Sequence, residues 1–480
     1  MSDLSINNVS TKEKIIEELT SEELKKMIAT VINPSNNIDL TNQNITDTKM
    51  KQYLHFYHPE FILMKHLQLI TEIFLDDNKI CCGFEMLFNN LQLSTITFIS
   101  LSNNKLEDKG AIFLAKYLTS YHPSTNPSHP SHNYLKNLEY LDISKNCIGF
   151  EGARAIAEAL KTHKNLNELD MSENNIGSKG ANYIGEMLKI NKSIFNLSIN
   201  DNNINMCQTI TFALSISINT SLSYLDIACN DFEENNENDN ENENENDNEN
   251  DNENDNYIDI IGEVIKFILS SKSIKTLICD CCEIDDINLQ FIANGLKENN
   301  ILTELYLRGN PISNEGIYLV FDALKNNDIT VLKHIAIANT LINNDCISSF
   351  AELLGCNDTI QSVDMHDTDI NNEGLIELST RPEFILNESI TLLTLGQELI
   401  EEDEPILNDS ISFILNRNQN LFWYPYIHKF NLFKYESHLM IITTILCNTY
   451  SDLQIRLPLQ VLIYIFKFFN RAKFLTIDYE

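Results

Sequence analysis

The 480-residue chain lacks long apolar segments. Its longest apolar runs, residues 439–446 and 461–466, fall far short of the roughly 20 residues that a membrane-spanning helix needs. No apolar signal segment opens the sequence, and the eleven cysteines are odd in number and show no framework spacing. These absences favour a reducing compartment, so we expect a cytoplasmic or nuclear protein without a membrane span.

Positive charge is also scarce. The chain has 34 Lys and Arg against 69 Asp and Glu, a formal net charge of −35, which disfavours nucleic acid as a partner. Residues 233–256 hold 12 acidic residues and 12 Asn, and without them the charge is −23. This composition cannot bury apolar surface and predicts a disordered Asn/acidic insertion. Its alternative use is as an electrostatic lure for a basic partner.

What the chain does have is a repeat. Asn146, Asn174, Asn202 and Asn230 lie 28 residues apart within the motif L-x-x-L-x-L-x-x-N-x-I. Further copies span 70–80, 96–106 and 302–312, degenerate ones start at Ile274, Leu332, Ile360 and Ile390, and a weak one surrounds Ile38 and Leu40. About twelve copies result, and such a period predicts a solenoid.

Each copy predicts a short strand followed by a helix. In the copy that starts at Ile96, Ile99 and Leu101 alternate as in a strand with one buried face, whereas Leu114 and Leu118 share one side of a helix. The repeated Asn lies at the bend between them. There its amide can both donate to and accept from buried backbone groups, which we interpret as a structural role. Irregular copies carry Gln43, Cys282, Thr340, Thr368 and Glu398 in this column.

The pattern resembles the leucine-rich-repeat family, specifically the long-repeat type of ribonuclease inhibitor and Ran GTPase-activating proteins. The resemblance covers residues 35–415. It rests on seven copies that keep the Asn and on glycines in one place before the helix, namely Gly110, Gly152, Gly180, Gly316 and Gly374. It implies an α/β horseshoe with a parallel concave sheet, convex helices and a concave binding face.

Two spacings exceed the period. Asn230 to Cys282 is 52 residues, which is one period plus the 24 residues of the Asn/acidic insertion. The 42 residues from Asn104 to Asn146 exceed it by 14, which corresponds to a Pro/Ser/His loop at about 121–134. Its His122, His129 and His132 suggest either a metal site or an ordinary solvated loop.

The residues between the buried strand positions should line the open face. The ten predicted partner-binding residues are Tyr140, Asp142, Glu168, Asp170, Asn196, Tyr224, Asp226, Asp280, Tyr306 and Arg308. Aromatic anchors beside carboxylates suit a protein partner that bears Lys or Arg. The alternative is that these are ordinary polar residues that keep a sheet soluble.

Catalytic and metal sites are not predicted. Asp142 and Asp170 should be neighbours, but on an open, wet face we expect the pair to stay solvated. His334 and His366 should lie about 13 Å apart along the strand direction, too far to share an ion. Cys279 and Cys282 fit buried positions of the template, which leaves only Cys281 and Asp280 outward. We therefore expect neither cofactor nor metal.

Both ends depart from the period. Residues 1–34 predict a helical cap. Residues 416–480 are rich in aromatic residues and predict two apolar helices, the second of which resembles the opening helix of an F-box. That resemblance implies a cullin-ligase adaptor contacted by Pro458, Leu462 and Phe466, whereas the simpler interpretation is a cap on the last strand.

The sequence thus predicts a non-enzymatic protein-binding scaffold with a contact face from Tyr140 to Tyr306. Two alternatives remain: a substrate receptor of a cullin ubiquitin ligase, and an activator of a Ran-type small GTPase. For the second, Arg308 is the one arginine on the predicted strands.

Overall fold

The computed structural model describes residues 32–33, 37–56, 70–91, 93–119, 134–205, 208–230 and 255–394. Outside these residues lie most of the predicted N-terminal cap, most of both insertions, Glu398, the three loop histidines and the whole segment 416–480. Residues 32–33 of the predicted helical cap form a strand instead. The chain divides into two units, residues 1–234 and 235–480, and each is described by itself.

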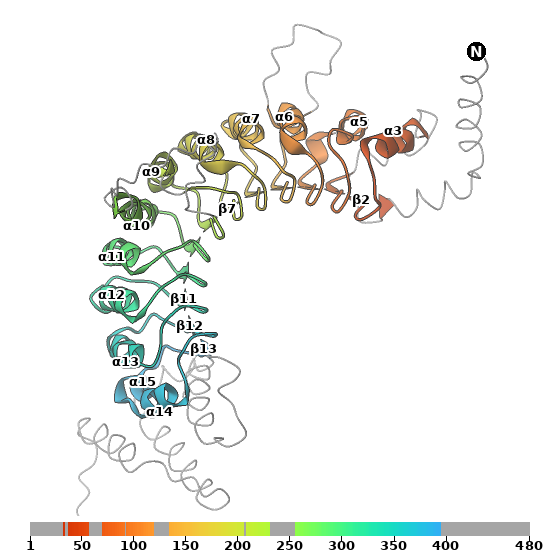
Figure 1. Cartoon of the computed structure of the whole chain (residues 1–480). Helices are drawn as coiled ribbons and strands as arrows, with labels where there is room; N and C mark the ends of the chain where they lie inside the picture. Colours follow the sequence, from red (N-terminus) through yellow and green to blue (C-terminus); the bar gives the residue numbers. More distant parts are fainter. Residues whose placement is uncertain are drawn as a thin grey trace, which may run out of the picture. The chain divides into compact units, whose positions relative to one another are not determined.

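Unit 1 alternates strands and helices, as the period predicts (Figure 1). Its elements are β1 (Ile32–Asn33), β2 (Asn37–Asp39), α3 (Asp47–Phe56), β3 (Glu72–Phe74), α5 (Phe84–Asn90), the 3-10 turn η1 (Leu93–Thr95), β4 (Phe98–Ser100), α6 (Glu107–Leu118), β5 (Tyr140–Asp142), α7 (Phe150–Leu160), β6 (Glu168–Asp170), α8 (Gly177–Ile190), β7 (Asn196–Ser198), α9 (Ile210–Ile218) and β8 (Tyr224–Asp226). Strands β2 to β8 pair in parallel, and β1 pairs antiparallel with β2.

Unit 2 repeats the arrangement. It comprises α10 (Asp255–Leu269), β9 (Thr276–Ile278), α11 (Asp286–Leu296), β10 (Glu304–Tyr306), α12 (Asn314–Lys325), β11 (His334–Ala336), α13 (Cys346–Cys356), β12 (Ser362–Asp364), α14 (Asn372–Thr380), α15 (Pro382–Leu386) and β13 (Leu392–Thr394). Strands β9 to β13 are all parallel. Helix α10 begins at Asp255, so the last two residues of the predicted insertion are helical.

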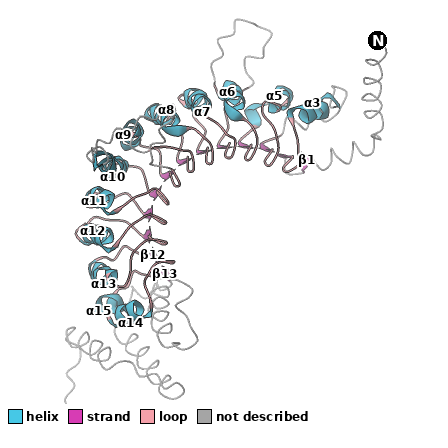
Figure 2. Ribbon diagram, viewed as in Figure 1, coloured by secondary structure: helices cyan, strands magenta, loops and turns pink. Residues whose placement is uncertain are grey.

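Within each unit the helices lie on one side of the short strands (Figure 2). The middle residue of each strand and the inner side of each helix form the core between them. Leu141 and Leu197 are fully buried, as are Leu114 and Ile156 on the helices. No described element covers the other side of the strands, which is the open side that the alternation predicts.

The Asn column has the predicted role. Asn174 donates from Nδ2 to the carbonyl oxygens of Ile143 and Met171 at 3.0 and 2.9 Å, and its Oδ1 accepts from the amide of Ile148 at 3.0 Å. In the irregular copies Thr340 keeps one such donation, from Oγ1 to the carbonyl of Ile337 at 2.8 Å. Gln43, in contrast, is exposed.

A second column of side chains, all amides except one histidine, lies where each helix turns into the next strand, and it was not predicted. Asn191 donates to the carbonyl of Leu160 at 2.7 Å and accepts from the amide of Ile194 at 3.0 Å. The column comprises His163, Asn191, Asn219, Asn299, Asn327, Asn357 and Asn387.

The repeated glycines lie inside the first turn of their helices, not before them as the sequence analysis placed them. Gly110 is the fourth residue of α6, and a Cβ there would lie 2.6 Å from the backbone oxygen of Cys81. A Cβ on Gly152 would lie 2.9 Å from that of Ala111 on the preceding helix. The glycines therefore allow neighbouring repeats to pack closely.

Candidate functional site

The open side of strands β3 to β8, here called the unit-1 strand face, presents two columns of outward residues. The pairing register aligns Asp142, Asp170, Ser198 and Asp226 in one column, and Tyr140, Glu168, Asn196 and Tyr224 in the other. All seven residues of this unit that were predicted to bind a partner therefore share one face.

Serine residues hold the carboxylates of the first column. Asp142 Oδ1 accepts from the amide and the hydroxyl of Ser144 at 2.8 and 2.7 Å. Asp170 repeats this geometry with Ser172, at 2.9 and 2.6 Å. A D-x-S sequence thus fixes each carboxylate by one of its oxygens. The other oxygen of Asp170 has no recorded hydrogen-bond partner in the described part of the chain.

Asp226 is held from the neighbouring strand. Its Oδ2 accepts from Asn200 Nδ2 at 2.9 Å and from the Ser198 hydroxyl at 3.4 Å, while Oδ1 accepts from the amide of Ala228 at 3.0 Å. The column is therefore continuous across β7, although β7 itself contributes no carboxylate.

These carboxylates are less solvated than expected. Asp142, Asp170 and Asp226 are half-buried, and burial is the largest cause that raises the pKa of each. The hydrogen bonds from Ser144 and Ser172 act in the opposite direction, and repulsion from neighbouring carboxylates adds a smaller upward contribution. We expected Asp142 and Asp170 to stay solvated, whereas burial removes part of the water around both carboxylates even on an open face.

An aromatic stack that was not predicted from the sequence adjoins the acidic column. The rings of Phe98 and Tyr140 are parallel, with centroids 4.2 Å apart, and Phe74 lies 4.9 Å from Phe98 at a tilt of 37°. Burial and the nearby carboxylates raise the pKa of Tyr140 to about 12. The copies at 70–80 and 96–106 contained the signal, since Phe74 and Phe98 occupy outward positions in them.

Asp280, Tyr306 and Arg308, the remaining predicted partner-binding residues, lie in unit 2. The predicted contact strip from Tyr140 to Tyr306 is therefore divided between the two units. Arg308 Nε donates to Asp364 at 3.0 Å and its NH1 to Asp280 at 3.4 Å. Its guanidinium also lies 4.9 Å from the ring of Tyr306.

Arg308 crosses the repeat of β11 to reach Asp364 on β12. Ala336 and Ala338 on the intervening repeat are fully buried, and His366 Nδ1 lies 2.7 Å from the other oxygen of Asp364. Burial raises the pKa of Asp364, but the hydrogen bonds from His366 and Arg308 outweigh it, so that the pKa is lowered overall.

His334 and His366 of unit 2 are not cross-strand neighbours. His334 pairs with Ser362, four residues before His366, as the template predicts, and its ring lies 4.9 Å from that of Tyr306. Burial is the largest cause that lowers the pKa of His334. Cys279 and Cys282 are buried and Cys281 is exposed, also as predicted. Among the described residues no three His, Cys, Asp or Glu side chains gather as metal ligands would.

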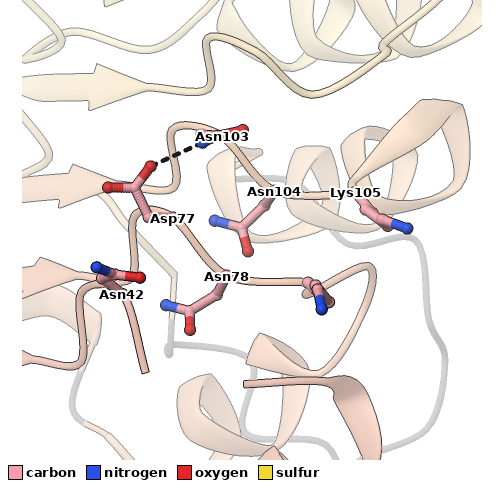
Figure 3. A pocket seen from close by; sticks show the side chains of 7 residues that line it. Asn42, Asp77, Asn78, Asn103, Asn104 and Lys105 are labelled. Atoms are coloured by element: carbon pink, nitrogen blue, oxygen red, sulfur yellow. Dashed lines mark hydrogen bonds between the residues drawn. The ribbon is translucent and has the colours of Figure 1, made fainter. Parts of the chain in front are cut away.

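A polar recess of about 550 Å³ lies at the strand ends of the first repeats (Figure 3). Asn103 Nδ2 donates to Asp77 Oδ1 at 2.7 Å across it, and Lys79 and Lys105 also line it. Its Asn78 and Asn104 are members of the Asn column and are committed to backbone groups. No described nucleophile with a base faces this recess.

This architecture, parallel strands alternating with helices over about twelve repeats, is a leucine-rich-repeat solenoid. The leucine-rich-repeat family model matches residues 92–115, 134–157, 162–185 and 298–320. No curated protein matches the chain. No helix in the described ranges has the length and apolar character to cross a bilayer.

A search of solved structures returns similar chains at low sequence identity and with TM-scores under 0.5. An internalin from Listeria monocytogenes is 16% identical, with 82% of this chain and 87% of that chain covered and a TM-score of 0.40. A chain of the Rad7 and Elc1 complex of yeast is 14% identical, with 86% and 88% covered and a TM-score of 0.43. The tropomodulin C-terminal domain of Caenorhabditis elegans is 16% identical, with 28% and 95% covered and a TM-score of 0.23. Likenesses of this level identify no partner.

Proposed function

We propose that this protein is a non-enzymatic scaffold that binds a partner protein on the unit-1 strand face. The observation that supports this function most is the register of Asp142, Asp170 and Asp226, three half-buried carboxylates in one column on a side that no described element covers. Among the described residues no metal-binding cluster of His, Cys, Asp or Glu lies beside this row of carboxylates, and such a row suits recognition better than chemistry.

The partner should present a basic surface. A partly desolvated carboxylate gains more from an opposite charge than a fully hydrated one does, because less water screens the attraction. The excess negative charge of the chain would also speed the encounter with a basic partner at low salt.

The test compares two double variants with the same change of charge. Asp142→Asn/Asp170→Asn removes two carboxylates from the strand face, and Glu158→Gln/Glu186→Gln removes two from helices α7 and α8, where they pair with Lys161 and Lys189. Proteins cross-linked in cell extract to the intact chain are quantified by mass spectrometry. We expect at least one abundant partner to fall about tenfold, on the order of 1.4 kcal/mol, with the strand-face variant only. Equal recovery with both variants would contradict the proposal.

The ubiquitin-ligase receptor remains an alternative that rests on Pro458, Leu462 and Phe466, outside the described residues. The GTPase-activator alternative would need Arg308 to leave Asp280 and Asp364 before it could reach a partner's nucleotide. A pull-down that compares the intact chain with one ending at Asn416 separates them. Loss of cullin components supports the receptor, and retention of a small GTPase by both forms supports the activator.

A further inference from the structure

The aromatic stack and the acidic column meet on strand β5. Tyr140 and Asp142 lie two positions apart on this strand, and each begins a row that runs in a different direction. The stack continues through Phe98 toward β3, and the carboxylates continue through Asp170 toward β8. A partner that lies across the strands would therefore contact apolar rings first and carboxylates next.

The geometry of the stack determines what it can bind. Phe98 and Tyr140 are parallel to within 1° and cover each other's faces, and Phe74 lies against the other side of Phe98. A cation needs an open ring face, whereas ring edges offer apolar contact. The faces that Phe98 and Tyr140 share are closed to a cation, so the edges of the stack suit an aliphatic or aromatic side chain, and a basic side chain belongs on the carboxylates.

Charge complementarity identifies the second part of the partner. Across β5 to β8 the outward positions include Asp142, Glu168, Asp170 and Asp226, and none of the strand residues is Lys or Arg. A cation placed between Asp142 and Asp170 would meet both carboxylates, because neighbouring strands are only about 4.8 Å apart.

The spacing of these groups can be compared with an extended chain. The midpoint of the Phe98–Tyr140 pair lies about 8 Å from the midpoint of the Asp142–Asp170 pair, because the two midpoints are one strand apart across the sheet and two residues apart along it. From there to Asp226 is two and a half strands, about 12 Å. In an extended segment residues i and i+2 are about 6.6 Å apart and residues i and i+4 about 13 Å, with their side chains on the same face.

We propose that the unit-1 strand face binds an extended partner segment with an apolar residue at position i and basic residues at i+2 and i+6. The apolar side chain contacts Phe98 and Tyr140, the first basic side chain lies between Asp142 and Asp170, and the second meets Asp226. This inference rests on the proposed function and adds the order and spacing of the residues that are recognised.

Synthetic peptides test the order and spacing. The probe is a fluorescein-labelled 15-residue peptide of Gly, Ser and Thr with Phe at position 5 and Arg at positions 7 and 11. In one control peptide the first Arg moves to position 8, which turns its side chain to the other face, and in a second Ser replaces Phe. Binding to the full chain is measured by fluorescence anisotropy at low salt. We expect both controls to bind about tenfold more weakly than the probe.

Matched protein variants tie the binding to the named residues. Phe98→Asn places at this position the residue that occupies it in β7, so the fold should tolerate the change. It should weaken the Phe peptide but not the Ser peptide. Asp142→Asn/Asp170→Asn should abolish the preference for Arg at position 7 over position 8, because these residues would then no longer be coupled to that arginine.

Two results would overturn the inference. The first is equal affinity of the chain for the probe and for the peptide with the shifted arginine. The second is tighter binding of a helical peptide with the same Phe and Arg content. If either occurs while Asp142→Asn/Asp170→Asn still loses cross-linked partners, the strand face remains a docking surface and only the extended, ordered segment is wrong. If those partners are retained as well, the proposed function fails with it.

Discussion

Replacement of Asn174 by Ala should be among the most damaging single changes on this chain. The side chain is 9% exposed and lies between two repeats. Its Oδ1 accepts from the amides of Asn146 and Ile148, each at 3.0 Å. Its Nδ2 donates to the carbonyls of Ile143, Met171 and Ser172 at 2.9 to 3.1 Å.

The magnitude follows from the groups left without a partner. Alanine orphans two buried amides, and each buried unsatisfied group costs about 1–3 kcal/mol. The carbonyls lose a shared donor as well, so we expect the free energy of unfolding to fall by about 3–5 kcal/mol. Asn174→Thr should lose less, because Thr340 in the same column still donates to a carbonyl at 2.8 Å.

Urea unfolding followed by circular dichroism measures the loss, and hydrogen exchange of the Asn146 and Ile148 amides locates it. Asn167→Ala is the control, because Asn167 is exposed and its side chain has no recorded hydrogen bond. A loss within about 1 kcal/mol of that control, with both amides still protected, would refute the view that the Asn column is an energetic requirement of the bend.

Two further changes test local electrostatics. The Nδ1 atom of His163 accepts from the amide of Leu166, and burial lowers the pKa of this histidine. Its contribution to the stability of the folded chain is therefore complete above the unfolded pKa of about 6.5 and is lost as the pH falls toward the lower folded pKa. His163→Asn introduces the residue that the next two repeats carry at this position. Between pH 7.5 and 5 the urea midpoint of the native chain should fall relative to that of the variant. Midpoints that change in parallel with pH would contradict this. Arg308→Met should raise the pKa of Asp364, which carbon NMR can measure. It should also lower the free energy of unfolding by about 1 kcal/mol, because the ion pair is partly exposed. An unchanged pKa would mean that His366 alone stabilises the charge.

The alignment of residues on neighbouring strands could be predicted because one buried side-chain amide recurs in each repeat. A side-chain amide that satisfies backbone groups at the bend must recur once per repeat, so Asn146 to Asn230 determine which residues align. The same chemistry operates at the other end of each repeat, and His163, Asn191 and Asn219 are also 28 residues apart. This second column could have been read from the sequence, but it lies outside the strand motif from which the period was counted.

Burial on the open side could not be read from alternation. Alternation states which side of the sheet a residue faces, but not how far its neighbours reach over it. Ala336 and Ala338 belong to the outward set and are nevertheless fully buried, in the repeat that Arg308 crosses to reach Asp364. Burial likewise raises the pKa of Asp142 and Asp170, although alternation places both on the open side.

The acidic column lowers the stability of the folded chain, and the fold itself does not require acidic residues at these positions. Ser198 occupies the same column in β7, so the repeat tolerates a neutral residue there. A raised pKa means that ionised Asp142 and Asp170 are less favourable in the folded chain than in the unfolded chain. This loss of stability is complete above the folded pKa and absent below the unfolded pKa. Asp142→Asn/Asp170→Asn keeps an oxygen that can accept from Ser144 and Ser172 but removes the charge.

We therefore expect this double variant to be more stable than the native chain at pH 7, with a difference in urea midpoint that shrinks as the pH falls through the raised pKa values. Glu158→Gln/Glu186→Gln, whose native carboxylates pair with Lys161 and Lys189, should show no such gain. A strand-face variant that is less stable at pH 7 would make the carboxylates structural. A gain in stability together with a loss of partner would instead mean that the column is retained for binding, since residues selected for recognition commonly reduce the stability of the unbound protein.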